Sequence, residues 1–421
     1  MTKPLKIATI GLGGYAYDHI KAVNWLAKDG LTELIAVVAL PSDRERLPER
    51  VDELQKKGVV LYESIDQFLA TGAHTVDVLM CAVGIHQHVP VSIAALRAGL
   101  HVYCEKPIAG TIQEVDALID AQKQAQKQVA IGFQYIPSRS VSELKARICD
   151  GRLGKVKSVK LMCCWPRSKR YYERNNWAGR LRIGNDWILD SPANNANAHF
   201  LFNLLYLSSN QPSEAARPAK LRAELYRANK IESTDLTQLQ FVADTGTDCY
   251  VILSHCGWER TRPIMQLTCE NGEAIWQGDF GETDIRYHDG STEHFENDRF
   301  EQWRYQIVRE FAEAILANEA TLCPPSLARA HTLTINAMHE SCPRIHTVPD
   351  EYIAEIEALE DYPPQGKELF RKIKDHDAAM QKAFEETKLF SELGLPWTEG
   401  IESAEVDIQG YSSFPKAAKI S

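Results

Sequence analysis

Short apolar runs alternate with amphipathic stretches along the first 135 residues. The run from Leu34 to Leu40 is apolar throughout, and most of Val76 to Val83 is apolar too, as in strands that are covered on both faces. The stretches between the runs have helical spacing. We expect strands at 6–10, 34–40, 59–62, 76–83, 101–104 and 129–133, and helices at 18–27, 51–57, 65–70, 90–98 and 112–126. This alternation predicts an α/β fold with a right-handed, doubly wound parallel sheet.

The pattern changes after residue 136. A helix at 141–150 precedes segments of alternating polar and apolar residues, and two turn sequences typical of hairpins, at 244–246 and 270–272, separate several of them. We expect strands at 156–165, 221–227, 236–243, 249–255, 265–270 and 273–277, and then helices at 300–317 and 326–341. These elements predict an α+β domain with a large, mostly antiparallel sheet that carries helices on one face.

The two patterns predict two domains, at 1–135 and 136–421. The second domain ends in an extension, residues 346–421, which we expect to be helical and polar with a loose tail at 410–421.

The first predicted strand runs into Gly11-Leu12-Gly13-Gly14-Tyr15-Ala16, which has the G-x-G-x-x-A spacing of dinucleotide-binding turns. Gly11 lets the chain turn off the strand, Gly13 leaves room for a pyrophosphate, and Ala16 lets the next helix pack close to the sheet. The helix N-terminus offers N–H groups and a partial positive charge to the phosphates. An ordinary glycine turn is the alternative, but the strand before it and the helix after it favour a cofactor site that includes Gly14 and Tyr15.

The end of the second predicted strand bears on the choice between NAD and NADP. NAD-binding domains usually carry Asp or Glu there, which holds the ribose 2′-hydroxyl. This chain has Leu40 instead, and Ser42 and Arg44 follow, which suit a 2′-phosphate. Asp43 is an alternative partner for the ribose, so both cofactors stay open, with a preference for NADP. A further alternative is that Asp43 and Arg44 begin a solvent-exposed helix.

Composition excludes several classes of protein. The chain has 421 residues, of which 44% are hydrophobic and 25% charged, as in a globular protein of two domains. Its net charge of −10 does not suggest a nucleic-acid partner. No apolar run reaches the ~18 residues of a membrane span. The chain passes from Met1 directly into the first strand, which leaves no room for a signal peptide, so we expect a cytoplasmic protein.

The ten cysteines lack the spacing of a disulfide framework or a metal site. There is no C-x-x-C, and Cys163 and Cys164 are adjacent. We therefore expect free thiols and no metal. Cys81 and Cys104 lie in apolar strands and are expected to be small core residues.

Candidate chemistry lies in Glu105-Lys106-Pro107, at the carboxyl end of a predicted strand, where open α/β sheets bind ligands. Pro107 disfavours helical geometry at Lys106, so Lys106 is expected in an extended turn. A free lysine has a pKa of about 10.4, and burial or a nearby cation would lower it enough for proton transfer at neutral pH. Adjacent side chains on an extended segment point to opposite sides, so Glu105 is expected to face the cofactor. A surface Glu–Lys pair is the alternative.

The glycine turn, Glu105-Lys106-Pro107 and the segment 132–135 together resemble the Gfo/Idh/MocA family of NAD(P)-dependent oxidoreductases, over residues 5 to about 345. The resemblance implies a Rossmann domain followed by a sheet domain. It places Lys106 near the nicotinamide and the reacting hydroxyl, and Glu105 on the nicotinamide side. The family's T-P-N-x-x-H loop corresponds to residues 83–88, where His88 matches and Ile85 replaces Asn. The contacts to cofactor expected from these motifs come from Ala82, His88, Glu105, Lys106 and Gln134.

The stretch from Tyr171 to Leu205 resembles two further signatures of the family, Asn-x-Trp-x-Gly and D/N-x-G/A-x-H. Asn195 and His199 match the second signature, with Asn where a carboxylate often stands. The resemblance makes His199 a second acid–base candidate. Asn195, four residues earlier on what we expect to be the same helix, would orient a substrate hydroxyl, since Asn carries no proton. A core histidine among aromatic residues is the alternative for His199.

Aromatic residues add candidates for substrate contact. Tyr135 lies in the segment that resembles the family, and Trp177, with Tyr171 and Tyr172, would line a sugar pocket through flat ring faces. Packing of a surface loop is the alternative for these three rings.

The resemblance implies reversible hydride transfer between nicotinamide and a hydroxyl-bearing carbon of a sugar, sugar derivative or cyclitol, with Lys106, His199 and Asn195 as catalytic residues. Two alternatives use the same fold: hydrolysis of glycosides with tightly held NAD, and regulation by bound cofactor or sugar without catalysis. The resemblance also implies a homodimer or homotetramer in which a second subunit covers the open face of the C-terminal sheet. The extension would close over the pocket or embrace that neighbour.

Overall fold

The computed structural model describes residues 3–278, 281–297, 304–361, 364–416 and 420. Packing divides the chain into two units, and each is described by itself. The first unit comprises residues 1–109, 113–138 and 300–329, and the second comprises 110–112, 139–299 and 330–421. The division differs from the expected ranges at 300–329, because helix α10 (Gln306–Ala317) packs in the first unit, with Phe311 against Tyr103.

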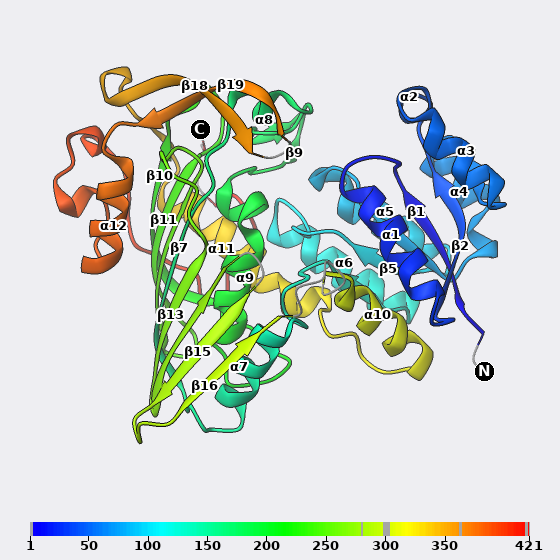
Figure 1. The fold of residues 1–421 in the computed structure, drawn as a ribbon, viewed down its shortest axis with the longest axis horizontal. Coiled ribbons are helices and arrows are strands. Elements are labelled where there is room, and N and C mark those ends of the chain that lie inside the picture. The colour runs from blue at the N-terminus through cyan, green and yellow to red at the C-terminus, as the bar shows by residue number, and fades with distance from the viewer. Residues whose placement is uncertain (1–2, 279–280, 298–303, 362–363, 417–419, 421) are drawn as a thin grey trace. The chain divides into compact units, whose positions relative to one another are not determined.

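The first unit contains a six-stranded sheet in the order β3-β2-β1-β4-β5-β6, with every pair of neighbours parallel. This is the expected doubly wound sheet. Its strands are β1 (Leu5–Ile10), β2 (Thr32–Val38), β3 (Val60–Tyr62), β4 (Val78–Cys81), β5 (His101–Cys104) and β6 (Val129–Ile131). The strands are short and mostly apolar because helices bury the sheet (Figure 1).

Helices connect these strands. They are α1 (Tyr15–Ala27), α2 (Pro41–Arg46), α3 (Pro48–Lys56), α4 (Ile65–Thr71), α5 (Ile85–Arg97) and α6 (Ile112–Ala125). The expected start of a helix at Pro90 is wrong, since α5 begins at Ile85 and includes the proline. Ile85, Val89 and Leu96 share one buried side of α5, so packing rather than the proline sets where the helix begins.

The second unit is built on a ten-stranded sheet with the order β16-β15-β14-β13-β7-β12-β11-β10-β17, and β20 pairs with β10. The pairs β7–β12 and β10–β17 are parallel and the others are antiparallel, so the expected mostly antiparallel sheet is confirmed. The strands are β7 (Val156–Cys164), β10 (Pro218–Arg227), β11 (Leu236–Ala243), β12 (Asp248–Ser254), β13 (Ile264–Cys269), β14 (Gly272–Gln277), β15 (Glu282–Tyr287), β16 (Thr292–Glu296), β17 (His346–Thr347) and β20 (Val406–Asp407).

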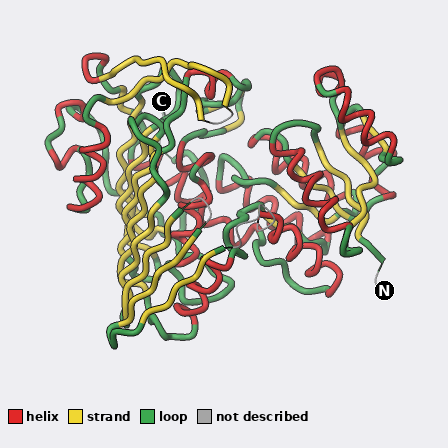
Figure 2. Tube along the Cα trace, in the orientation of Figure 1, coloured by secondary structure: helices red, strands yellow, loops and turns green. Residues whose placement is uncertain are grey.

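Helices cover one face of this sheet. Figure 2 shows them as a layer along the long strands, and they are α7 (Arg139–Cys149), α9 (Ala198–Leu207) and α11 (Pro325–Ser341). Every residue of α9 is buried, because α9 lies between the sheet and its neighbouring helices. Phe200 of α9 packs on Trp276 of β14, with ring centroids 5.7 Å apart. We call this the inner face of the sheet, and the opposite one the outer face.

The C-terminal extension differs from the expectation of a wholly helical segment, which is wrong. Residues 353–373 form a hairpin of β18 (Ile353–Asp361) and β19 (Pro364–Ile373), and only then does α12 (His376–Glu386) follow. Gly366 has φ of +108°, a backbone conformation outside the helical range, so a continuous helix cannot pass through this position. Parts of two predicted elements, the helix start at 300–303 and the tail at 417–419 and 421, lie outside the described residues.

Short elements complete the second unit. They are α8 (Lys169–Glu173), the two-residue strands β8 (Arg182–Ile183) and β9 (Asp186–Trp187), and a π-helical turn at Pro192–Ala196. Within the described ranges, no helix combines the length and the apolar character needed to cross a membrane.

Candidate active site

The glycine turn after β1 has the geometry that its sequence predicts. Gly11 has φ of +96°, and a Cβ built there would lie 2.8 Å from the Cβ of Ala16, so only glycine fits. Gly14 has φ of +55° and no atom within 4 Å of a built Cβ, which leaves open space at the start of α1. Among the residues that the structure describes, no side chain caps this helix end. The turn therefore presents the N-terminus of α1 as a site for an anion.

Two arginines beside the turn were missed by sequence reasoning. A Cβ on Gly13 would lie 3.1 Å from the guanidinium of Arg46. Arg50 donates a hydrogen bond to the carbonyl oxygen of Leu12 at 2.5 Å, and its guanidinium lies 3.8 Å from the centre of the Tyr17 ring. Both arginines follow β2 closely in sequence, and that clustering of basic residues was the available signal. The surroundings of the turn are therefore cationic.

The segment after β2 is the short helix α2, which buries none of its residues. Leu40 is 51% exposed, so no acidic residue stands at the end of the strand. Arg44 donates to the carbonyl oxygen of Ala39 at 2.9 Å, and Asp43 forms an ion pair with Arg46 at 2.5 Å. Asp43 and Arg44 do lie in a helix, although it begins at Pro41 and both residues are half-buried, and Asp43 is paired with Arg46. Whether either residue contacts the cofactor stays a prediction.

The carboxylate of Glu105 is buried, with partners on both oxygens. One oxygen lies 2.9 Å from Nε2 of His19, and the other accepts the backbone N–H of Lys106 at 3.1 Å. Gly132 makes room for it, since a Cβ there would lie 2.8 Å from Glu105 Oε1. His19 was missed, although it stands one helical turn after the glycine motif and therefore on the same side of α1 as Tyr15.

Tyr15 and Gln134 meet next to this carboxylate. The Tyr15 hydroxyl donates a hydrogen bond to the side-chain oxygen of Gln134. Tyr15 is 42% exposed, but partial burial where its hydroxyl meets Gln134, and after it the charge of Glu105, raises the pKa of Tyr15 above its ordinary value. Two predicted cofactor residues from distant parts of the chain thus lie together in the first unit.

Lys106 is partly buried at the carboxyl end of β5, where Pro107 follows it. His88 fixes the next backbone group: its Nδ1 lies 2.6 Å from the carbonyl oxygen of Pro107 and its Nε2 lies 3.1 Å from that of Val83. Burial lowers the pKa of His88, which favours the neutral ring, and a neutral ring donates a hydrogen bond to one of these two carbonyl oxygens at a time. His88 holds the turn that carries Lys106. Its contact with cofactor stays a prediction, as does that of Ala82, which follows β4.

In the second unit, Asn195 and His199 do not share one α-helix as expected. Asn195 lies in the π-helical turn, and α9 begins after Asn197, so the spacing of four residues does not place the two side chains on one helical face. His199 is 8% exposed. The roles of both residues stay predictions.

An acidic residue that sequence reasoning missed supports Asn195. Asp190 is 3% exposed and accepts hydrogen bonds from the side-chain amide of Asn195 at 2.9 Å and from the backbone N–H of Gly179 at 2.6 Å. The motif expects an acid four residues before the histidine, but Asp190 lies further from His199 in sequence because the π-helical turn stands between them. A carboxylate is therefore present beside Asn195, although not at the matching position.

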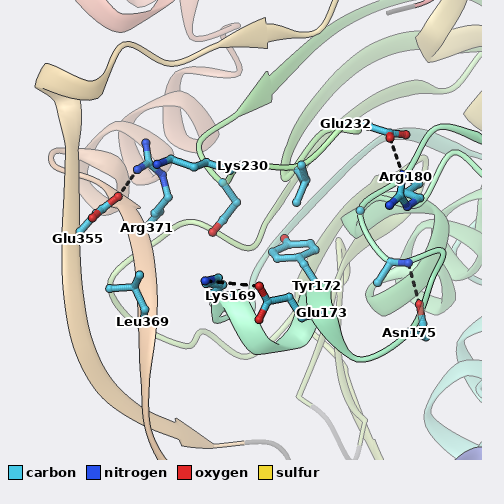
Figure 3. A pocket seen from close by; sticks show the side chains of 14 residues that line it. Lys169, Tyr172, Glu173, Asn175, Arg180, Lys230, Glu232, Glu355, Leu369 and Arg371 are labelled. Carbon is cyan, nitrogen blue, oxygen red and sulfur yellow. Dashed lines mark hydrogen bonds and ion pairs between the residues drawn. The ribbon is translucent and has the colours of Figure 1, made fainter.

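The aromatic stretch divides around a cavity of about 680 Å³ within the second unit (Figure 3). Tyr172 lines this cavity, and its hydroxyl lies 3.2 Å from Nδ1 of His255. Tyr171 and Trp177 do not line it; the guanidinium of Arg174 lies 3.7 Å and 5.1 Å from the centres of their rings. For these two rings the alternative, packing of a loop, describes the observed contacts. Tyr135 is 4% exposed in the first unit.

Charged pairs form much of the cavity wall. Arg180 contacts Glu232 at 2.7 Å, and Lys169 contacts Glu173 at 3.5 Å (Figure 3). The hairpin β18–β19 supplies Glu355, Leu369 and Arg371. Such a lining suits a polar, hydroxyl-rich molecule better than an apolar one.

Among the side chains that the structure describes, no three or more His, Cys, Asp or Glu residues are grouped so that they could hold a metal ion. All ten cysteines are free thiols, and every one except Cys149 is buried.

Comparison with known proteins identifies the first unit. The sequence model of the Gfo/Idh/MocA group, described as "Oxidoreductase family, NAD-binding Rossmann fold", matches residues 5–133. The inositol 2-dehydrogenase/D-chiro-inositol 3-dehydrogenase of Lactiplantibacillus plantarum is 25% identical over 152 residues, 36% of this chain and 41% of that protein. The levoglucosan dehydrogenase of Pseudarthrobacter phenanthrenivorans is 36% identical over 87 residues, 21% of this chain and 22% of that protein. The aligned segments thus span less than half the length of these relatives.

A solved structure shares the fold over more of the chain. The WlbA dehydrogenase of Bordetella pertussis, in complex with NADH and UDP-GlcNAcA, matches with a TM-score of 0.65 and 17% identity, and covers 80% of this chain and 95% of its own. The two-domain fold, a parallel Rossmann sheet followed by a large mixed sheet, is therefore that of these oxidoreductases. Residues 5–133 are thus similar in sequence to the NAD-binding Rossmann domain of the Gfo/Idh/MocA oxidoreductase family.

Proposed function

We propose that this protein is an NAD(P)-dependent oxidoreductase that moves a hydride between nicotinamide and a hydroxyl-bearing carbon of a sugar, sugar derivative or cyclitol. The glycine turn carries the proposal, because Gly11 and Ala16 leave no room for another residue and α1 opens on an uncapped N-terminus. The names of the relatives, inositol and levoglucosan dehydrogenases, support the substrate class.

The proposed roles of the side chains follow from their chemistry. The bound nicotinamide supplies or accepts the hydride. Lys106 takes the hydroxyl proton in oxidation and returns it in reduction, and His199 hydrogen-bonds the same oxygen or shares the proton. Asn195 orients the substrate hydroxyl, since an amide donates and accepts hydrogen bonds without carrying a proton. Asp190 holds the Asn195 amide in one orientation.

We propose NADP as the preferred cofactor. Leu40 stands where an acid would hold a 2′-hydroxyl, and Ser42, Arg44 and Arg46 follow it in α2. Arg46 lies beside Gly13 of the turn, and its ion pair with Asp43 is exposed, so a 2′-phosphate can compete for it. The binding of NAD is the alternative, in which Asp43 leaves Arg46 and accepts from the ribose.

The two other functions remain alternatives. A glycoside hydrolase of this fold would retain NAD through purification, whereas a regulator would bind cofactor or sugar without turnover. Lys106 at the end of β5 favours catalysis over binding alone. A cytoplasmic location and the homodimer or homotetramer implied by the resemblance also stay predictions.

A titration with NADH and NADPH, followed by nicotinamide fluorescence, tests the proposal. We expect the wild type to bind NADPH more tightly, Arg46→Glu to lose that preference, and Lys106→Met to lose turnover on sugars and cyclitols. Gly13→Val should bind neither cofactor, because its side chain fills the space beside the turn. Failure of the wild type to bind either cofactor would refute the oxidoreductase assignment.

A further inference from the structure

The outer face of the ten-stranded sheet is covered in part by the C-terminal end of the same chain. In Figure 1, α12 lies on the side of the sheet opposite α9. Apolar side chains of both layers form one buried cluster. The sheet contributes Tyr226, Leu236, Tyr250 and Ile252, and the extension contributes Met380, Ala383, Phe384, Phe390 and Trp397. We call residues 376–398 the cover.

Polar side chains of the sheet form hydrogen bonds with the cover, in addition to the apolar contacts. The Tyr250 hydroxyl contacts the carbonyl oxygens of Ala383 at 2.8 Å and Lys388 at 2.6 Å. The amide of Gln238 donates to Lys388 and accepts the backbone N–H of Phe390 at 2.7 Å. Gln238 is fully buried, and such a side chain costs free energy unless its hydrogen bonds are made. The cover supplies those bonds.

Glu224 of β10 shows the same match with an acidic group. It is fully buried, and its carboxylate accepts hydrogen bonds from the backbone N–H of Ser391 at 3.2 Å, from the Ser391 hydroxyl and from Tyr226 at 2.6 Å. Of the hydrogen bonds that described residues make to the Glu224 carboxylate, the one from Tyr226 does not depend on the cover. The outer face of β10 to β12 is thus built to be covered by this segment.

A chain of hydrogen bonds fastens the first turn of the cover. The Ser254 hydroxyl lies 2.7 Å from Nε2 of His376, whose Nδ1 lies 2.8 Å from Asp377, and Asp377 accepts the backbone N–H groups of Trp258 and Glu259 at 3.0 Å. The order Ser–His–Asp is that of a hydrolase triad. Ser254 and His376 are 0% and 1% exposed, however, so no substrate reaches the hydroxyl. The bonds join β12 to α12.

Two parts of the outer face lie beyond the cover. One is a hollow on β7 and β10 to β12, lined largely by polar and charged residues such as Lys220 and Arg222, where Val242 is 43% exposed. The other, on β13 to β16, is polar. Its outward residues include Gln266, Thr268, Glu273, Gln277, Asp284, Arg286 and His294, and Asp284 contacts His294 at 2.8 Å. Ile275 is the large apolar side chain exposed there, at 39%. The buried centre of a stable protein interface is depleted of charged residues and rich in apolar ones. This half of the face does not have that composition.

We propose that the cover takes the place of a second subunit on this sheet, so the protein does not self-associate through it. The resemblance implies a second subunit on the open face of the sheet, but the cover, which belongs to the same chain, occupies part of that face. If the protein is a dehydrogenase, the activity per chain should then be independent of protein concentration.

Hydrogen exchange and light scattering, measured on the full chain over a range of concentrations, test this proposal. We expect exchange in residues 376–398 to be slow and independent of concentration. Tyr250→Phe, which removes a hydroxyl beneath the cover, should speed exchange there. Ile275→Arg, on the uncovered half of the same face, serves as the matched control and should change neither exchange nor mass.

Each outcome decides the proposal. A particle with the mass of one chain supports it, as does an oligomer that Ile275→Arg leaves intact while exchange in the cover stays constant, because its interface then lies elsewhere. An oligomer that Ile275→Arg splits would overturn the proposal. Exchange in the cover that slows as the protein is concentrated would overturn it too, since a second copy would then be protecting the segment.

Discussion

At the scale of single residues, the neighbours of Glu105 fix the position of its carboxylate. Both carboxylate oxygens have partners, and Gly132 lies against it so closely that a methyl group does not fit. His19 and the backbone N–H of Lys106 hold the carboxylate in one position. Through Lys106 the same contacts tie the end of β5 to α1, which connects the catalytic candidate to the cofactor turn.

Gly132→Ala tests this packing. A Cβ would lie 2.8 Å from Glu105 Oε1, so the carboxylate must move from His19, and we expect a loss of about 1–3 kcal/mol in the free energy of unfolding. Unfolding of the first unit in urea measures this change in the free energy of unfolding. In a double variant with Glu105→Ala the added methyl group has space, so the two losses should fall short of additivity. Strict additivity would show that the contact does not matter.

Asp190→Asn tests the support of Asn195. An amide at position 190 keeps the volume of the side chain but presents an N–H group to donors that need an acceptor. Losing one such charged hydrogen bond is worth about 1.5–3 kcal/mol, so we expect kcat to fall about 10- to 100-fold. The Kd for cofactor, measured by fluorescence, should stay unchanged because the hydrogen bonds of Asp190 go to Asn195 and Gly179 and not to the glycine turn. An unchanged kcat would exclude the positioning role.

The place of a residue in the fold could be predicted where it depends only on its neighbours in the sequence. Gly11, Ala16 and Lys106 follow from the turn and the strand end in which they stand. His19, Arg46 and Asp190 could not, because each acquires its role from a partner far along the chain or across a turn of unforeseen type. The π-turn at Pro192–Ala196 is the clearest case, since the motif spacing assumed a regular helix.

At the scale of elements, α9 is held by a buried lysine. Lys145 of α7 is 3% exposed, and its ammonium group donates hydrogen bonds to the carbonyl oxygens of Tyr206 at 2.5 Å, Ser209 at 2.7 Å and Glu214 at 3.3 Å. These carbonyls lie at and just after the C-terminal end of α9, where the helix leaves them unpaired and where a positive charge is favourable. Because α9 carries His199, the lysine also stabilises the candidate site.

Lys145→Met should therefore destabilise the second unit. The variant retains most of the apolar stem but removes the ammonium donor. The carbonyl oxygen of Tyr206 keeps the backbone N–H of Ser209, and Glu214 is exposed, so Ser209 loses most. A buried carbonyl group without a donor costs about 1–3 kcal/mol, and we expect a loss of that size. The urea midpoint measures it. Lys157→Met, at an exposed position of β7, is the matched control and should shift the midpoint little. Equal shifts in both variants would contradict the role of Lys145.

Strands could be predicted where the pattern of apolar residues along the chain was clear. The parallel strands of the first unit are short apolar runs, and each was recognised. The strands β15 and β16 carry charged residues on the outer face, which hid their alternation, and the hairpin of β18 and β19 has enough Glu and Ala to resemble a helix. In each of these strands, pairing with a neighbour rather than the local sequence decides the structure.

At the scale of the whole molecule, buried histidines couple stability to pH. His339 of α11 is fully buried, and within the described part of the chain neither ring nitrogen has a hydrogen-bond partner. Burial lowers its pKa from 6.5 to about 3. Burial likewise lowers the pKa of His255, where the charges of Arg167 and Arg174 add to the effect. The folded protein therefore keeps these rings neutral in mildly acidic solution.

The sign of the effect follows from proton uptake. Between about pH 3 and pH 6.5 the unfolded chain binds a proton at residue 339 and the folded chain does not, so acid favours unfolding by about 1.4 kcal/mol per pH unit for this one group. The stability that neutral His339 permits is complete above pH 6.5 and is lost as the pH falls below it. His339→Leu removes the titrating group without removing a hydrogen bond. Leucine also removes a buried polar ring that has no hydrogen-bond partner among the described residues, which favours the variant at every pH. We expect its urea midpoint to exceed that of the wild type by more at pH 5 than at pH 7.5, and parallel pH profiles of the two proteins would contradict this account.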